Sequence, residues 1–122
     1  MEVIPQDIGR VLLNIINNAF YAVDARKKSG EADYKPIVDL TTQHLNNSTI
    51  RISVSDNGTG MSQETIDKVF QPFFTTKPTG QGTGLGMSIS YDIITKVHGG
   101  ELSVTSEPGK GSIFQINIPN HE

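Results

Sequence analysis

Apolar residues recur every three or four positions near the start of the chain, between residues 6 and 28. They are Ile8, Val11, Leu12, Ile15, Ile16, Ala19, Phe20 and Val23. Pro5 precedes this run and Gly30 follows it, which is the usual asymmetry at the two ends of a helix. The spacing therefore predicts an amphipathic helix over residues 6–28, with its apolar side against a core.

Apolar and polar residues alternate in four later segments, which is the pattern of half-buried strands. These segments span residues 37–45, 49–56, 101–106 and 112–119. The first two are separated by Asn46, Asn47 and Ser48, which are turn-forming residues, so we expect a hairpin there. The last two are joined by residues 107–111, which contain a Pro-Gly pair.

Two more helices and one loop are expected between these pairs of strands. Ser62 is a good N-cap for a short helix with an apolar side. A second long helix is predicted over residues 85–98, where Gly99 and Gly100 follow as its end. Residues 71–84 are rich in Pro, Thr and Gly, and they predict a mobile loop. The order of elements predicts one α+β domain, a two-layer sandwich with helices on one face of a mostly antiparallel sheet.

Composition narrows the classes of function. The 122 residues carry a formal net charge of −3, so no basic surface is available for nucleic acid or for a membrane. Cysteine is absent, which excludes disulfides, thiolate metal sites and a cysteine nucleophile. No apolar run approaches the roughly 20 residues of a spanning helix, and no signal-peptide pattern is present. We expect a cytoplasmic domain cut from a longer protein.

Asp56 is the first candidate for chemistry. It has the same strand parity as Ile52 and Val54, so its carboxylate should point to the covered face. A buried carboxylate needs donors, and the exocyclic amine of adenine would be one. Gly58 and Gly60 follow at once and would let a flat ligand lie against the backbone. The alternative is an ordinary Asp-Asn-Gly turn with no ligand.

Asn14 and Asn18 lie four residues apart at the border of the apolar side of the first helix. Asparagine is a poor residue for a helix interior, so two on one flank suggest a function. A neutral amide oxygen can ligate Mg²⁺ when phosphates and water supply the other ligands. The alternative is a pair of solvated amides.

A third cluster of Gly82, Gly84 and Gly86 leads into the predicted second long helix, where free N–H groups could hold phosphates. Neither the P-loop pattern nor the dinucleotide fingerprint fits this cluster, and a plain flexible loop is the alternative.

Five segments in order resemble the motifs of the ATP-binding catalytic domain of sensor histidine kinases, in the superfamily of DNA gyrase, Hsp90 and MutL. Residues 13–19 are similar to its N box, 56–61 to its first glycine box and 69–77 to its F box. Residues 82–87 resemble its second glycine box and 109–114 its last. The resemblance covers essentially the whole chain. It implies a Bergerat fold, with about three helices on one face of a mixed, mostly antiparallel sheet.

The resemblance also implies roles at matching positions, beginning with the base. Asp56 would accept the adenine amine, Gly58 and Gly60 would lie against the base, and Ser112 would complete a water network there. One departure is Tyr21, where many kinases of the family carry a basic residue. Arg26, Lys27 or Lys28 could substitute for it only from unfavourable helix positions.

On the phosphate side, the resemblance makes Asn18 the Mg²⁺ ligand and Asn14 part of the phosphate wall, with both counted as catalytic. Lys77 is a possible phosphate contact from a lid over residues 70–84, in which Phe73 and Phe74 are anchors or partner contacts. Further nucleotide contacts are implied at Gly82, Thr83, Gly84, Leu85 and Gly86.

The implied reaction is transfer of the γ-phosphate of Mg²⁺–ATP to a histidine. His44, His98 and His121 do not stand in the helical context of a phosphoacceptor. The acceptor is therefore expected on a dimerisation domain of the parent protein, with a response regulator downstream in two-component signalling. Asn14 stands where the ATPase relatives carry a Glu, and an amide cannot act as a base, so hydrolysis should be slow. The alternatives are an ATP-driven clamp, a serine kinase of the anti-sigma type, and a domain that binds a partner without nucleotide.

Overall fold

A computed structural model describes residues 5–46, 48–71, 86–97 and 99–119. Four strands form one sheet in the order β1-β2-β4-β3, and every neighbouring pair is antiparallel. The strands are β1 (Val38–Asn46), β2 (Thr49–Asp56), β3 (Glu101–Glu107) and β4 (Gly111–Pro119). The helices are α1 (Pro5–Lys28), α2 (Gln63–Lys68), α3 (Gly86–Asp92) and the π-helix η1 (Ile93–Val97).

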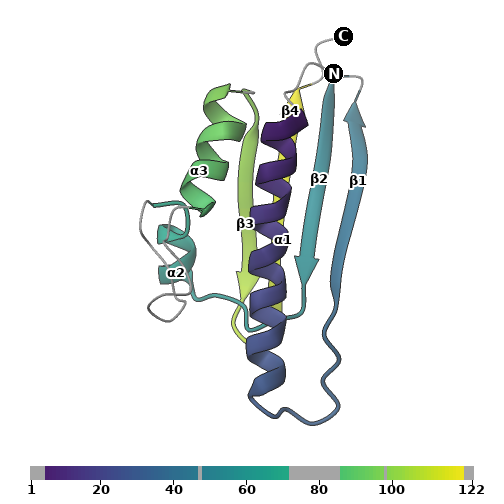
Figure 1. Cartoon of the computed structure of the whole chain (residues 1–122), viewed down its shortest axis with the longest axis vertical. Helices are drawn as coiled ribbons and strands as arrows, with labels where there is room; N and C mark the ends of the chain where they lie inside the picture. Colours follow the sequence, from purple (N-terminus) through teal and green to yellow (C-terminus); the bar gives the residue numbers. More distant parts are fainter. Residues whose placement is uncertain (1–4, 47, 72–85, 98, 120–122) are drawn as a thin grey trace.

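The helices lie on one face of the sheet, as the predicted two-layer sandwich requires (Figure 1). The long helix α1 runs along the strands across the middle of this face, and α2 and α3 lie toward the β3 edge. This arrangement leaves β1 as the edge farthest from α2 and α3.

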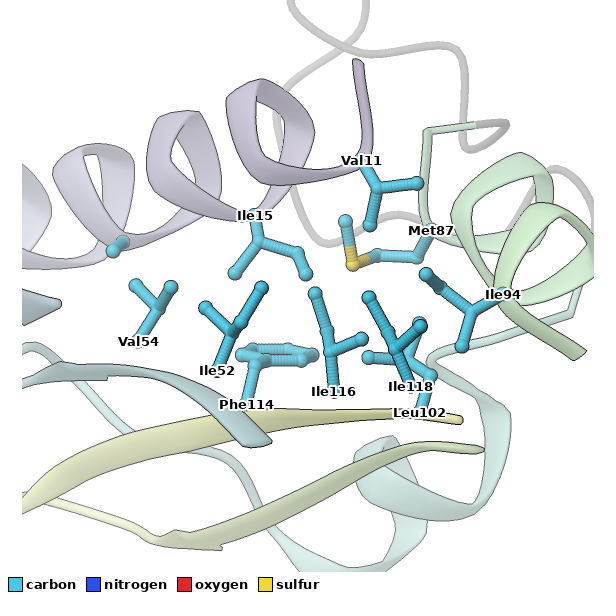
Figure 2. Packing of buried hydrophobic residues seen from close by; sticks show 11 residues of the cluster. Val11, Ile15, Ile52, Val54, Met87, Ile94, Leu102, Phe114, Ile116 and Ile118 are labelled. Atoms are coloured by element: carbon cyan, nitrogen blue, oxygen red, sulfur yellow. The ribbon is translucent and has the colours of Figure 1, made fainter. Parts of the chain in front are cut away.

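The core lies between α1 and the inner side of the sheet (Figure 2). Val11, Ile15 and Ala19 of α1 are almost fully buried, which confirms the predicted apolar side of this helix. They pack on side chains from the strands and from the α3 region, namely Ile52, Val54, Met87, Ile94, Leu102, Phe114, Ile116 and Ile118. Each fully buried side chain of this size stabilises the fold by about 1.5–3 kcal/mol.

Strand register decides which polar groups share the core side. Asp56 pairs with Ser112 of β4 in the same antiparallel register that pairs Val54 with Phe114. Because side chains alternate along a strand, Asp56 and Ser112 lie on the face that α1 covers. Both are buried, with exposed fractions of 9% and 6%. The predicted inward direction of Asp56 is confirmed.

Three local features refine the expectations from the sequence. The side chain of Ser62 accepts a hydrogen bond from the Thr65 N–H, so the predicted N-cap of α2 is confirmed. Phe20 is 55% exposed, because it lies on the side of α1 that points away from the sheet; its place in the apolar pattern was wrong. Within the described residues, the predicted helix of 85–98 is also not uniform, since the backbone widens into η1 after Asp92.

The change of helix type at Ile93 has a local cause. Three β-branched residues stand together, and such residues crowd the preceding turn of an α-helix. The Thr95 hydroxyl also donates to the Tyr91 carbonyl at 2.7 Å, which favours a locally altered helix. The wider turn still leaves Ile94 fully buried in the core.

Candidate functional site

Asp56 ends strand β2 as a buried carboxylate. The Gly58 N–H donates to its Oδ1 at 2.8 Å, and the backbone N–H of Ser112 is a second donor. Burial raises the pKa of Asp56 above its ordinary value, and the two backbone hydrogen bonds act in the opposite direction. Within the described part of the chain, no Lys or Arg forms an ion pair with it. The carboxylate thus has spare acceptor capacity for a ligand donor.

Ser112 belongs to a short chain of hydroxyl groups beside Asp56. Its Oγ lies 2.7 Å from the Oγ of Ser106, where either hydroxyl can donate. Ser106 also donates to the Gly111 carbonyl at 2.9 Å and accepts from the Met61 N–H at 2.8 Å. These bonds tie the segment after β2 to the β3–β4 hairpin, so the glycine-rich turn is held at both ends.

Gly58 and Gly60 are glycines because other parts of the protein lie against them. A Cβ on Gly58 would come within 2.6 Å of the Cβ of Ala22 on α1. Gly60 has a φ of 71°, and a Cβ there would overlap the Glu107 carbonyl oxygen. The sequence suggested room for a flat base at both positions. The structure gives each of them a packing reason that holds without any ligand.

Replacing Gly60 by alanine should therefore destabilise the nucleotide-free domain by about 2 kcal/mol or more, because left-handed backbone strain adds to steric overlap. Urea unfolding without nucleotide measures this loss. Gly109→Ala is the matched control, since Gly109 has a φ of 79° with open space around its Cβ position. It should cost only the left-handed strain, about 1 kcal/mol. Equal midpoints for the two variants would contradict the packing role of Gly60.

Asn14 contacts the start of α3. Its Nδ2 donates to the Ser90 Oγ at 3.2 Å and lies 3.4 Å from the Gly86 carbonyl oxygen. The structure thus brings together Asn14 of the asparagine pair and Gly86 of the glycine cluster, 72 residues apart. Asn18 lies one turn further along the same flank and is half-buried, whereas Asn17 is exposed. The partial burial of Asn14 and Asn18 agrees with their predicted place at the border of the apolar side.

Helix α1 connects these two groups of residues. Ala22 touches Gly58 at one end, and Asn14 touches Gly86 two turns earlier. At 1.5 Å per residue, the two contacts are separated by about 12 Å along the helix axis. That length suits a ligand with a base at one end and phosphates at the other.

Several other predicted contacts lie outside the described residues, namely Lys77, Gly82, Thr83, Gly84 and Leu85. Phe73, Phe74 and most of the predicted lid lie outside them as well.

A hollow of about 340 Å³ opens at the same end of the sheet, and Asp56, Ser106 and Ser112 are among its lining residues. Its lining includes Ser55, Thr105 and Ile113, which pair in register across β2, β4 and β3. These residues alternate with Asp56 and Ser112, so their side chains lie on the face opposite α1. The lining therefore combines residues from both faces of the sheet at these strand ends.

Phe70 joins the end of α2 to its neighbours. Its ring stacks on Tyr91 of α3 with centroids 5.1 Å apart and meets Phe114 of β4 edge-on at 6.4 Å. Phe70 is the second residue of the segment that resembles the F box, and the predicted lid begins here. Phe70, at the start of the predicted lid, thus lies in a packed aromatic cluster beside α3.

Sequence reasoning missed a group of residues that form hydrogen bonds at the turn after Asp56. Arg26, Tyr34 and Asn57 form hydrogen bonds there, although the sequence left Arg26 only as a poor substitute for a phosphate contact. Its guanidinium contacts the carbonyl groups of the turn after Asp56 instead. The one signal in the sequence for these contacts was Asn57, directly after Asp56, and it was interpreted as part of the turn motif alone.

This fold and this arrangement of residues define a class of protein. The family described as histidine kinase-, DNA gyrase B- and HSP90-like ATPases matches residues 4–122, and the chain belongs to it. The expected family and the two-layer fold are confirmed. None of the helices in the described ranges is both long and apolar enough to cross a membrane.

Individual relatives narrow the class to the kinase branch. The chain is 37% identical over 121 residues to sensor kinase CckA of Brucella abortus, covering 93% of this chain and 13% of that protein. It is 40% identical over 112 residues to signal transduction histidine-protein kinase AtoS of Escherichia coli, covering 92% and 16%. Among solved structures, the nucleotide-free catalytic domain of histidine kinase ThkA aligns with a TM-score of 0.78 and 31% identity. That alignment covers 98% of this chain and 71% of the other.

Proposed function

We propose that this domain binds Mg²⁺–ATP and transfers the γ-phosphate to a histidine on a separate dimerisation and phosphoacceptor domain of its parent protein. The parent would act in two-component signalling, with a response regulator downstream and this domain in the cytoplasm. The observation that carries the proposal is the Asp56 carboxylate, buried on the covered face with backbone donors on one side and spare acceptor capacity. The sensor-kinase relatives support the same class of reaction.

The residues present fit a purine nucleotide. The exocyclic amine of adenine is the donor that a buried carboxylate lacks, whereas guanine presents a carbonyl at the corresponding ring position. Ser112 lies beside Asp56 through its backbone N–H and its hydroxyl chain, in a position to hold a bridging water. Gly58 and Gly60 would border the base through their backbone, in addition to the packing described above.

The phosphate end fits Mg²⁺ and an anion. The amide oxygen of Asn18 is a neutral hard ligand of the kind Mg²⁺ accepts beside phosphate oxygens and water. When bound, the metal would neutralise charge on the phosphates. Asn14 would contact the phosphates from its place beside Gly86. The remaining proposed contacts are Lys77, Gly82, Thr83, Gly84, Leu85 and Gly86.

The side chains favour transfer to an acceptor over hydrolysis. A carboxylate could accept a proton from attacking water, but Asn14 has a neutral amide with no basic nitrogen or oxygen at physiological pH. The domain would act by positioning the nucleotide and by offsetting charge, which are the main sources of catalysis in phosphoryl transfer. The nucleophile would come from the other domain.

The test uses ATP labelled on the γ-phosphate, Mg²⁺, and this chain with the phosphoacceptor domain of the same parent. We expect label on the acceptor that is lost in acid and kept in base, as phosphohistidine requires. An acceptor whose histidine is replaced by alanine is the control and should stay unlabelled. Acid-stable label would indicate a serine kinase. Phosphate release at the same rate without acceptor would indicate an ATPase clamp, and no nucleotide binding would indicate a partner-binding domain.

A further inference from the structure

Arg26 stands in the last turn of α1 with only 19% of its side chain exposed. Its Nε and one terminal nitrogen form two hydrogen bonds to the carboxylate of Glu31, at 2.7 and 2.9 Å. The guanidinium also lies over the ring of Tyr34, 4.7 Å from the ring centre. The bidentate ion pair and the aromatic stack together fix the plane of the guanidinium, independently of its other contacts.

The remaining nitrogen of Arg26 points to the turn after β2. It donates to the carbonyl oxygen of Asn57 at 2.9 Å and lies 3.3 Å from that of Gly58. Tyr34 adds its hydroxyl, 3.0 Å from the same Asn57 carbonyl oxygen. The two carbonyl oxygens that follow Asp56 are therefore held by side chains from elsewhere in the chain.

Asn57 is held by its side chain as well. Its Oδ1 accepts from the Ile37 N–H at 2.8 Å, and its Nδ2 donates to the Lys35 carbonyl at 2.8 Å. The segment between α1 and β1 is thereby attached to the turn. The bonds of this group hold the backbone and the Asn57 side chain of the turn, whereas the Asp56 carboxylate is itself oriented by the Gly58 N–H.

We propose that Arg26, Glu31 and Tyr34 form a positioning assembly that fixes the turn of Asp56, and so sets the affinity and base selectivity of the nucleotide site. The inference rests on the proposed nucleotide binding and adds residues that do not touch the base. Arg26 holds the carbonyl groups of Asn57 and Gly58, the Gly58 N–H then orients the carboxylate, and the carboxylate reads the base. A small displacement of a hydrogen-bonding group at such a site costs much of its discrimination.

The geometry requires arginine in particular. Its planar fork serves four oxygen atoms at once, two of Glu31 and one each of Asn57 and Gly58. Lysine has one compact ammonium group and cannot reach both sides in one plane. Arg26→Lys should therefore behave like Arg26→Met, even though it keeps the charge.

Calorimetry with non-hydrolysable ATP and GTP analogues tests the assembly. Arg26→Lys and Arg26→Met should each weaken binding of the ATP analogue about tenfold and lower the ATP-to-GTP preference, with the Mg²⁺ dependence unchanged. The matched control is Lys28→Met, which removes a charge from the same helix end. Among the described residues, Lys28 forms an ion pair with Asp24 alone, at an exposed site, and this variant should bind like the parent.

A backbone readout separates positioning from general stability. The amide resonance of Gly58 in a ¹H–¹⁵N spectrum reports its hydrogen bond to Asp56, and it should move in both Arg26 variants while the amide of Ile116 in the core stays fixed. If Arg26→Met does not fold, Tyr34→Phe removes the hydroxyl that contacts the carbonyl oxygen and the Oδ1 of Asn57, and it keeps the ring under Arg26. It should weaken binding in the same direction by a smaller factor.

The outcomes distinguish the two proposals. If the parent chain does not bind the ATP analogue, the proposed function fails and this inference falls with it. If the parent binds with a preference for adenine, but the folded Arg26 and Tyr34 variants keep that affinity and preference, only the positioning assembly is overturned. Lower stability with normal binding by the folded fraction would overturn it too.

Discussion

Asp56→Ala is expected to weaken binding of a non-hydrolysable ATP analogue by about a hundredfold or more, as measured by calorimetry with Mg²⁺ present. The variant removes the acceptor for the adenine amine and leaves the Gly58 and Ser112 N–H groups without their partner. A site built to hydrogen-bond a ligand group discriminates strongly when that pairing is lost. Asp39→Ala is the matched control, because Asp39 is an exposed aspartate on β1. This variant should bind the analogue as the parent does.

Measurements of folding stability distinguish a loss of nucleotide binding from a loss of folded protein in the Asp56 variants. Because burial raises the pKa of Asp56 in the folded state, ionisation of this group disfavours folding. Its contribution to stability therefore falls as pH rises through the interval above the ordinary aspartate pKa, and neutral pH lies on the less stable side. Asp56→Asn should consequently fold at least as well as the parent at neutral pH and still lose affinity. A folded Asp56→Ala with unchanged binding would contradict the assignment.

Asn18→Ala is expected to remove most of the Mg²⁺ dependence of nucleotide binding. We expect the ratio of affinities with and without Mg²⁺ to fall about tenfold or more toward one, while the metal-free affinity stays near that of the parent. The reason is that the variant deletes the proposed metal ligand but leaves the Asp56 end of the site intact. Titrations with and without a chelator measure the ratio.

Asn17→Ala is the control for the metal site. Asn17 is the adjacent residue on α1, has the same side chain, and is exposed. Its replacement should leave the Mg²⁺ dependence unchanged. If Asn18→Ala retains the full dependence, or if Asn17→Ala loses as much, then the metal is held by other residues.

Local periodicity explains why much of the fold could be predicted. The alternation over residues 49–56 gave the bounds of β2, and its parity placed Asp56 on the covered face. The preference of serine for the N-cap position likewise predicted the start of α2 at Ser62. Such signals depend on side chains only a few residues apart, so one sequence is enough to read them.

Contacts between distant segments explain most of what could not be predicted. Phe20 fitted the helical spacing of apolar residues, but the packing of α1 on the sheet leaves its side of the helix uncovered. The hydrogen bond of Asn14 to Ser90 joins residues 76 apart, and that of Arg26 to Asn57 joins residues 31 apart. No pattern along the chain specifies such pairs. The packing of Gly58 on Ala22 is of the same kind, which is why its motif suggested only a ligand.

A crystal structure of this chain with Mg²⁺ and a non-hydrolysable ATP analogue tests the central claim most directly. We predict the exocyclic amine of adenine within hydrogen-bond distance of the Asp56 carboxylate, with the phosphates toward Asn14 and Asn18. A purine bound elsewhere, or an Asp56 carboxylate that makes no contact with it, would contradict the account.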